Sequence, residues 1–194
     1  MAELKAIQKY LNSFGREVIK NAKSNLKSAG KGGGKLEKSL KFRVLPNPDG
    51  YTVEFTMADY GTFVDKGVKG KGGEIPNGKY KGKWGGRRHY QTWEGQRKDS
   101  PYKFGSGSGP KDGLRKGIAS FIRKRGLQPR SEGGQYMSTK GLIYLISRNI
   151  YIRGIHGISF FQKPLGDAYK EFNLGFLGAL KEDILTGLTQ FKQS

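Results

Sequence analysis

Cysteine is missing from the 194 residues of this chain. Its absence excludes disulfide bonds, thiolate catalysis and metal sites built on cysteine, and it fits a protein that folds in a reducing cytoplasm. Long apolar runs are missing as well, since no stretch approaches the roughly 18 consecutive apolar residues of a membrane span. The first residues begin a helical pattern without the apolar region of a signal peptide. We therefore expect a soluble protein with no membrane contact that is made in the cytoplasm.

Apolar residues are scarce and glycines are many, because 35% of the chain is hydrophobic and 31 residues are glycine. A large part of the chain is therefore expected to be loop. The length corresponds to one domain with one sizeable core. We expect a single domain over 1–194, made of a helix and a β-hairpin in 1–65, a basic loop insertion in 66–117 and a helical part in 118–194.

Acidic residues are few, with 16 Asp and Glu against 36 Lys and Arg, which gives a net charge of +20. The excess is uneven along the chain. Residues 1–65 hold 11 basic and seven acidic side chains, residues 66–117 hold 14 and four, and residues 118–194 hold 11 and five. Half of the excess thus lies in 66–117. A concentrated positive field of this kind attracts an anionic partner such as DNA, RNA or an acidic protein surface.

Apolar residues recur every three or four positions over 3–29 and again over 164–191, which predicts two long amphipathic helices. Between residues 40 and 57 apolar and polar residues alternate on both sides of a turn, which predicts an antiparallel hairpin. Shorter apolar patterns predict helices over 114–125 and 138–153. The expected fold class is α+β: a small antiparallel sheet covered by the long N- and C-terminal helices, with a long loop insertion rich in glycine, lysine and aromatic residues.

The patterned sequence ends in a corner at 57–70. Its aromatic and apolar residues are spaced so that one irregular helical turn could press them onto a single surface. These residues are Tyr60, Phe63, Val64 and Val68. Neighbouring glycines let the backbone leave this turn sharply, and Asp65 and Lys66 are expected to stay in water. The pattern indicates a packed corner that anchors a loop.

Residues 66–117 show no sustained period, and their glycines are interleaved with basic and aromatic residues, including both tryptophans. The segment could hold single-stranded nucleic acid, with bases stacked on its rings and phosphates bound by its lysines and arginines. It could equally order against a neighbouring subunit, where Trp, Tyr and Arg are common anchors, and we favour this interface. The candidate partner-binding residues of the corner and the insertion are Tyr60, Phe63, Val64, Lys79, Tyr80, Lys81, Lys83, Trp84, Arg87, Arg88, Tyr90 and Trp93.

No set of residues indicates catalysis. Residues 73–79 match the beginning of a phosphate-binding P-loop, but Tyr80 stands where that motif requires Ser or Thr. The two histidines have no metal-ligand partner at helical or turn spacing. Glu182 and Asp183 are adjacent on what we expect to be an exposed helix face, whereas acid–base catalysis needs opposed groups. We expect no enzyme activity, no catalytic residue, no cofactor and no metal.

Two motifs resemble a known family. The corner has the form Tyr-Gly-x-Phe-Val-Asp-Lys-Gly-Val over 60–68, and it follows a Leu-x-x-Ser-Leu segment at 36–40 and the strand pair. The later run 154–165 ends in phenylalanine, two further residues, Pro and Leu before the closing helix. In this order the motifs resemble the minor tail or tail-completion components of tailed bacteriophages, which sit at the neck between capsid and tail. The long insertion after Gly67 departs from the pattern, because shorter members pass through a brief loop there.

The resemblance implies a structural virion protein of the neck, which completes the tail or joins head and tail. It implies a homo-oligomeric ring, a hexamer or a dodecamer, around the DNA channel. The implied partners are connector or portal-side neck proteins and the tail tube or tail terminator. The insertion would reach a neighbouring subunit or one of these partners, and its positive charge would meet acidic surfaces or passing DNA.

The alternative is a basic nucleic-acid-binding protein of the ribosome-associated or nucleoid type. The isoelectric point near 10.1 is the argument for it. The sequence has no recognisable helix-turn-helix, zinc knuckle or aromatic RNA-binding motif. If this alternative holds, insertion lysines and arginines should touch phosphates, and affinity should fall steeply with salt.

Overall fold

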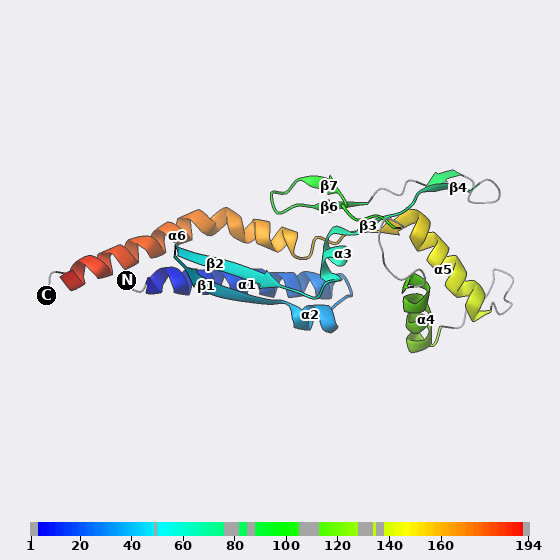
Figure 1. The fold of residues 1–194 in the computed structure, drawn as a ribbon, viewed down its shortest axis with the longest axis horizontal. Coiled ribbons are helices and arrows are strands. Elements are labelled where there is room, and N and C mark those ends of the chain that lie inside the picture. The colour runs from blue at the N-terminus through cyan, green and yellow to red at the C-terminus, as the bar shows by residue number, and fades with distance from the viewer. Residues whose placement is uncertain are drawn as a thin grey trace. The chain divides into compact units, whose positions relative to one another are not determined.

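The computed structural model describes residues 4–48, 50–75, 82–84, 88–104, 113–127, 134 and 138–191. Its elements are helices and short strand pairs (Figure 1), which confirms the predicted α+β class. Contacts divide the chain into two compact units. Unit 1 consists of Met1–Asp65, Gln91–Lys98 and Ile158–Ser194, and unit 2 consists of Lys66–Tyr90 and Asp99–Gly157.

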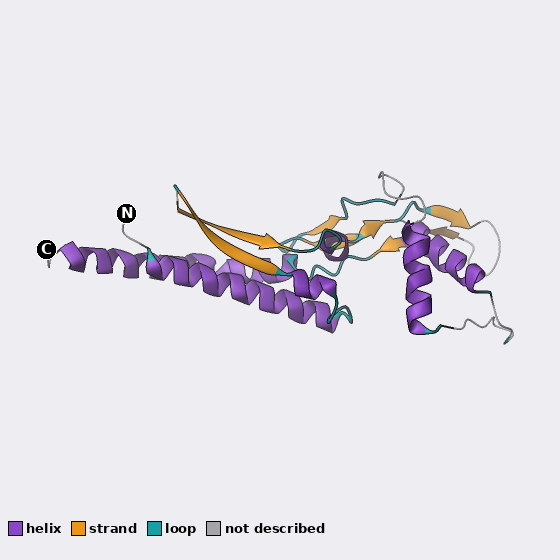
Figure 2. Cartoon of the chain, turned by 60° about the horizontal axis from the view of Figure 1, so that its bottom comes forward, coloured by secondary structure: helices purple, strands orange, loops and turns teal. Residues whose placement is uncertain are grey.

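Two long helices frame unit 1. They are α1 (Lys5–Ser28) and α6 (Gln162–Phe191), and they confirm the helices predicted from the apolar spacing. The shorter elements between them are α2 (Lys35–Ser39), β1 (Lys41–Asn47), β2 (Gly50–Thr56) and α3 (Gly61–Lys66). The strands form the predicted antiparallel hairpin, with Phe42 opposite Phe55 and Val44 opposite Val53. Figure 2 shows this hairpin lying along the two long helices.

The core of unit 1 follows one face of α1. The buried apolar side chains of this helix recur mostly at spacings of three or four, so they share a stripe. They are Ile7, Leu11, Phe14, Val18, Ile19, Ala22 and Leu26. Aromatic rings from the hairpin and from α6 pack beside them, with ring centroids 5.1 Å apart for Phe14 and Phe172 and 5.4 Å apart for Phe55 and Phe161. The long helices therefore cover the hairpin, as predicted.

Gly15 lies inside α1, where glycine costs about 1 kcal/mol of stability relative to alanine. The close approach of β1 explains its presence. A Cβ atom at this position would lie only 2.2 Å from the ring of Phe42. A larger residue would push the hairpin away from α1, so this local weakness of the helix permits the packing of unit 1.

Asp183 of α6 caps the first turn of α1. Its two carboxylate oxygens accept hydrogen bonds from the N–H groups of Ala6 and Ile7, each at 2.9 Å. Such N–H groups have no acceptor within their own helix, and Leu4, the residue before α1, provides no capping side chain. The prediction of an exposed Asp183 is wrong, because this residue is half-buried and ties α6 to the start of α1.

The predicted loop insertion contains several very short strands. The strand pairs are β3 (Val68–Lys69) with β8 (Gly154–Ile155), β4 (Gly73–Ile75) with β5 (Gly82–Trp84), and β6 (His89–Gln91) with β7 (Arg97–Asp99). The division between the two units passes through β6 and β7. The prediction of a continuous loop is wrong for these segments, because strands of two or three residues are too short to show alternation in a sequence.

Two helices of unit 2 confirm the shorter helical predictions. They are α4 (Gly113–Arg125) and α5 (Thr139–Arg153). The side chain of Ser138 accepts a hydrogen bond from the N–H of Gly141 at 3.1 Å, which caps α5 as predicted. Gly154 ends α5 with a φ of 78°, a conformation that glycine adopts without steric cost.

Candidate functional site

The corner folds as α3 and the beginning of β3. Val64 packs against the core of unit 1, and Val68 is buried in unit 2. Tyr60 and Phe63, in contrast, are 45% and 44% exposed. The prediction that all four side chains press onto one surface is therefore wrong. The two valines point inward in different units, and the two aromatic rings remain open to solvent.

Asp65 is the central residue of the corner. The expectation that it stays in water is wrong, because it is only 2% exposed. Its Oδ1 accepts hydrogen bonds from the N–H groups of Phe161 at 2.8 Å and Gln162 at 3.4 Å, where α6 begins. Its backbone carbonyl accepts a further bond from the N–H of Ser159 at 2.9 Å. The two segments on which the family resemblance rests are thus bonded to each other within unit 1.

Ser159 forms a strained turn before α6. Its φ is 48°, which residues other than glycine seldom adopt. Its carbonyl accepts a bond from the N–H of Lys163 at 3.2 Å, and its Oγ accepts one from the N–H of Gln91 at 2.8 Å. Backbone strain persists only where the surroundings hold it. This turn is therefore a fixed junction between the corner, α6 and residues 91–98, and no pattern in the sequence distinguishes it.

Trp93 belongs to this junction in unit 1. Its ring meets the ring of Tyr169 edge to face, with centroids 5.2 Å apart, and the backbone N–H of Trp93 donates to Oε1 of Gln162 at 3.2 Å. Both rings nevertheless remain exposed over a large part of their surface. Trp93 therefore packs in part on α6 of its own chain and still presents an aromatic surface to solvent.

Arg88 and Tyr90 are half-buried in unit 2. One terminal nitrogen of Arg88 lies 2.9 Å from Nε2 of His156, and the carbonyl of Arg88 accepts a hydrogen bond from the N–H of the buried Ser100 at 2.7 Å. The ammonium of Lys66 lies 5.8 Å from the centre of the Tyr90 ring. Both predicted partner-binding residues thus help to hold unit 2 together.

Of the remaining predicted residues, two lie on a described strand. Lys83 and Trp84 lie on β5, whose backbone pairs with β4 so that Lys83 stands opposite Glu74. Lys79, Tyr80, Lys81 and Arg87 lie outside the described residues. The phosphate contacts expected of these side chains therefore stay a prediction.

An apolar surface on α6 was not foreseen from the sequence. Five aliphatic side chains share one face of this helix and are more than half exposed, and Leu174 reaches 79%. We call this set the α6 stripe, and it consists of Leu174, Leu177, Ile184, Leu185 and Leu188. The apolar spacing predicts a helix in this region, but it does not show which apolar positions are left without cover.

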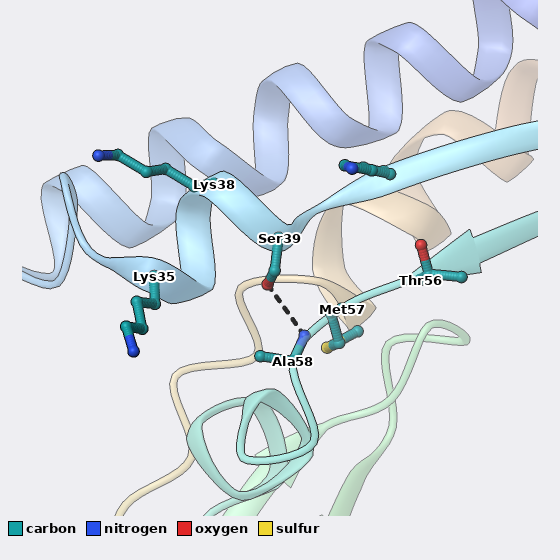
Figure 3. Close-up of a pocket in the computed structure, with 7 residues that line it drawn as sticks. Lys35, Lys38, Ser39, Thr56, Met57 and Ala58 are labelled. Atoms are coloured by element: carbon teal, nitrogen blue, oxygen red, sulfur yellow. Dashed lines mark hydrogen bonds between the residues drawn. The ribbon is translucent and has the colours of Figure 1, made fainter.

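A hollow of about 510 Å³ beside α2 opens widely to solvent (Figure 3). It is lined by Lys35, Lys38, Ser39, Lys41, Thr56, Met57 and Ala58. The hydroxyl of Ser39 is already engaged, because it accepts from the N–H of Ala58 at 2.9 Å and donates to the carbonyl of Leu36 at 2.8 Å. No carboxylate or imidazole lines the hollow, so it offers no pair of groups for acid–base chemistry.

The described part of the chain was also examined for residues that could bind a metal ion and for helices that could cross a membrane. No group of three or more His, Asp and Glu residues there could hold a metal ion. No helix among the described residues has both the length and the apolar character that crossing a membrane requires.

Comparison with protein-family models, with curated proteins and with solved structures found no match. The function therefore has to be inferred from the residues of this chain: the bonded junction around Asp65, the exposed aromatic rings of unit 1 and the α6 stripe.

Proposed function

We propose that this protein is a structural component of the neck of a tailed-bacteriophage virion, where it completes the tail or joins head and tail. In this proposal its copies assemble as a ring around the DNA channel and meet each other through α6. The observation that carries the proposal is the α6 stripe.

The α6 helix is apolar on two opposite faces. One face packs against α1 through residues that include Phe172, Phe176 and Ala179. The α6 stripe lies on the other face, since positions 174, 177, 184, 185 and 188 coincide on a helix with about 3.6 residues per turn. The exposed Lys181 lies on this face between Leu177 and Ile184, and exposed apolar side chains gathered on one face of a helix mark a candidate interaction site. The α6 stripe is therefore expected to be covered in an assembly.

The charge of α6 favours a second copy of this chain as the covering surface. Residues 162–191 hold three basic and four acidic side chains, although the whole chain carries +20. Copies of a strongly basic protein repel each other through their basic surfaces. Over its whole length α6 is near neutral, although Lys170 and Lys181 lie on the same side as the α6 stripe, so copies that meet through α6 repel each other less than copies that meet through a strongly basic segment.

The exposed aromatic residues of unit 1 provide a second contact surface. Tyr60, Phe63 and Trp93 all keep more than 40% of their surface exposed, and Tyr and Trp are enriched at the centres of interfaces. We assign these rings to contacts with the connector or portal side of the neck, or with the tail tube or tail terminator. The virion is the location that this assignment requires.

The resemblance to tail-completion proteins supports the same proposal. Its two motifs are separated by about 90 residues of sequence, yet Asp65 of the first accepts hydrogen bonds from Phe161 and Gln162 of the second. Each motif supplies one side of the hydrogen-bonded junction at the start of α6. This contact gives a reason for both motifs to occur in the same chain.

Light scattering on the purified protein tests the proposal. We expect the wild-type chain to have the mass of a closed ring, or to form one when connector or tail components are added. Leu174→Gln combined with Leu188→Gln should reduce the mass to that of a monomer, because it replaces exposed apolar groups without disfavouring the helix. Thr186→Gln, on the same helix outside the α6 stripe, is the matched control and should assemble normally. A wild-type chain that remains monomeric with and without those components would contradict the proposal.

The alternative function, a basic nucleic-acid-binding protein of the ribosome-associated or nucleoid type, is favoured by a separate observation. Unit 2 holds 19 basic and four acidic side chains, against 17 and 12 in unit 1. If nucleic-acid binding is the whole function, the protein should bind plain DNA or RNA as a monomer and ignore neck components.

A further inference from the structure

Two helices of unit 2 carry charges of one sign only. Between them α4 and α5 contain eight basic residues and no acidic residue. Seven of the eight are exposed and the last is half-buried. They are Arg115, Lys116, Arg123, Lys124, Arg125, Lys140, Arg148 and Arg153. We call the exposed seven the α4–α5 basic face, a name for the exposed surface of the helix pair as a whole, since the cations of α4 project around most of that helix.

These cations are held on a packed pair of helices. Ile118 and Ile122 of α4 are buried, as is Ser147 of α5, and Figure 1 shows the two helices next to each other. Ile122 and Ile143 line a hollow between the helices. Charges anchored on packed helices keep a defined spacing, in contrast to charges on a linker.

The helix dipole explains only part of this arrangement. Arg123, Lys124 and Arg125 lie in the last turn of α4, where cations are favourable. Arg115 and Lys116 lie near the beginning of α4, and Lys140 lies in the first turn of α5, where a cation is unfavourable. The helix dipole therefore does not account for the positions of these three cations.

No carboxylate of the described chain neutralises the α4–α5 basic face. The ion pairs found among the described residues involve Lys27, Arg43, His89 and Lys170, and none of these belongs to α4 or α5. Like charges carried on one packed pair of helices repel one another. An anionic partner with regularly repeated charges would relieve that repulsion at several positions at once.

Two aromatic rings orient arginines of this surface. The guanidinium of Arg115 lies 6.0 Å from the centre of the Tyr144 ring, and that of Arg125 lies 5.9 Å from the centre of the Phe121 ring. Proteins that bind single strands use open aromatic faces as stacking platforms for bases. Here each ring already has an arginine over it, and a guanidinium is suited to bind phosphate oxygens in pairs. The arrangement fits a phosphate backbone better than unstacked bases.

We propose that the α4–α5 basic face binds the sugar–phosphate backbone of double-stranded DNA without sequence preference. The proposal does not depend on ring assembly or on a location in the neck. It also differs from the prediction made from the sequence, which assigned phosphate contacts to the lysines and arginines of 79–88.

Fluorescence anisotropy of the full chain with a labelled duplex of about 30 base pairs, measured over a range of salt concentrations, tests the proposal. The variant replaces Arg115, Lys116, Arg123 and Lys124 by Gln. The control replaces Lys9, Arg16, Lys20 and Lys31 of unit 1 by Gln, which removes the same charge from exposed positions. The α4–α5 variant should lose about 10- to 100-fold in affinity at about 0.1 M salt and show a shallower salt dependence, whereas the control should lose about 3-fold or less.

Equal losses in both variants would overturn the proposal, because binding would then follow net charge alone. Unchanged affinity in the α4–α5 variant would overturn it as well. Single-stranded DNA or polyglutamate that competes better than the duplex would show that the partner is a single strand or an acidic protein surface.

Lysine acetylation of the wild-type protein, with and without duplex, gives an answer even if the variant fails to fold. Bound DNA should protect Lys116, Lys124 and Lys140 more strongly than Lys9 and Lys20. Equal protection of both groups, or protection of the unit 1 lysines alone, would refute the assignment to α4 and α5.

Discussion

The two units of this chain differ in the number of apolar side chains that they bury and in the net charge that they carry. Among the described residues, unit 1 contains twelve of the buried hydrophobic side chains and unit 2 contains three. Their charges differ in the opposite sense, with an excess of five basic residues in unit 1 and of 15 in unit 2. Burial of apolar surface stabilises unit 1. Unit 2 relies more on short strand pairs and polar contacts, and it carries a charge excess that favours an anionic partner.

From this difference we propose a division of roles. A large core holds the junction around Asp65 and the α6 stripe in fixed geometry, as a repeated subunit contact requires. A small core with an excess of basic over acidic residues is suited to bind a charged polymer, since many weak phosphate contacts add up. Substitutions in unit 1 should therefore affect stability and assembly, whereas those on the exposed face of unit 2 should affect binding.

The largest expected effect comes from removal of a core side chain in unit 1. Phe160 is 0% exposed and belongs to the cluster on α1, so Phe160→Ala should lower the free energy of unfolding by about 3–5 kcal/mol. Phe121→Ala on α4 is the contrast, because that ring is half-exposed and its loss should cost less than about 1 kcal/mol. Urea unfolding of both variants measures the difference. Equal losses would contradict the contrast between the units.

Loss of the charged cap at the start of α6 should come next. Asp65→Asn removes the buried carboxylate that accepts from Phe161 and Gln162. We expect a loss of about 1.5–3 kcal/mol in unfolding free energy, because hydrogen bonds to a charged group are stronger than neutral ones. Asp59→Asn, at an exposed position two residues before α3, is the matched control. A variant at position 65 as stable as that control would show that the junction does not depend on the charge.

The cap of α1 should have a smaller effect. Asp183→Asn weakens the acceptor for Ala6 and Ile7 and should cost about 1 kcal/mol, as for other helix caps. Hydrogen exchange should become faster in the first turn of α1 and remain unchanged at its centre. Glu182→Gln changes the neighbouring exposed residue and is the control. It should leave hydrogen exchange in α1 unaltered.

The smallest effect concerns pH. A hydrogen bond from the N–H of Gly33, followed by the charge of Lys27, lowers the pKa of Glu37 below its ordinary value. Because the pKa is lower in the folded state, ionised Glu37 stabilises the fold above its unfolded pKa, and this contribution is lost as the pH falls through the folded pKa. Glu37→Gln should therefore be slightly less stable than wild type near neutral pH and equal to it in acid. If Glu37→Gln and wild type differed in stability only in acid, the result would contradict a lowered pKa of Glu37 in the folded state.

The long periodic elements could be predicted from the sequence. Apolar spacing predicts α1, α6, the hairpin, α4 and α5, because each pattern is local and repeats several times. The two caps could not be predicted, since Asp65 and Phe161 are 96 positions apart and Asp183 and Ala6 are 177 positions apart. A carboxylate next to a lysine in a glycine-rich corner looks solvated until its distant partner is known.

The candidate surfaces were predictable only in part. The sequence names Tyr60, Phe63 and Trp93 as partner-binding residues, and the structure leaves them exposed. The α6 stripe escaped prediction because apolar spacing does not tell a covered face from an uncovered one. Arg123, Lys124 and Arg125 are explained by the helix dipole when α4 is taken alone, and only the pairing of α4 with α5 reveals a larger basic face.

The central claim is that copies associate through the apolar surface of α6, and the salt dependence of the mass in solution tests it most directly. Charged contacts weaken as salt rises, whereas apolar contacts do not. Light scattering of the DNA-free wild-type protein at low salt and at about 0.5 M salt should therefore give the same ring mass, or a higher fraction of rings at the higher salt. Assemblies that dissociate into monomers at the higher salt would contradict the account, because their contacts would then be electrostatic.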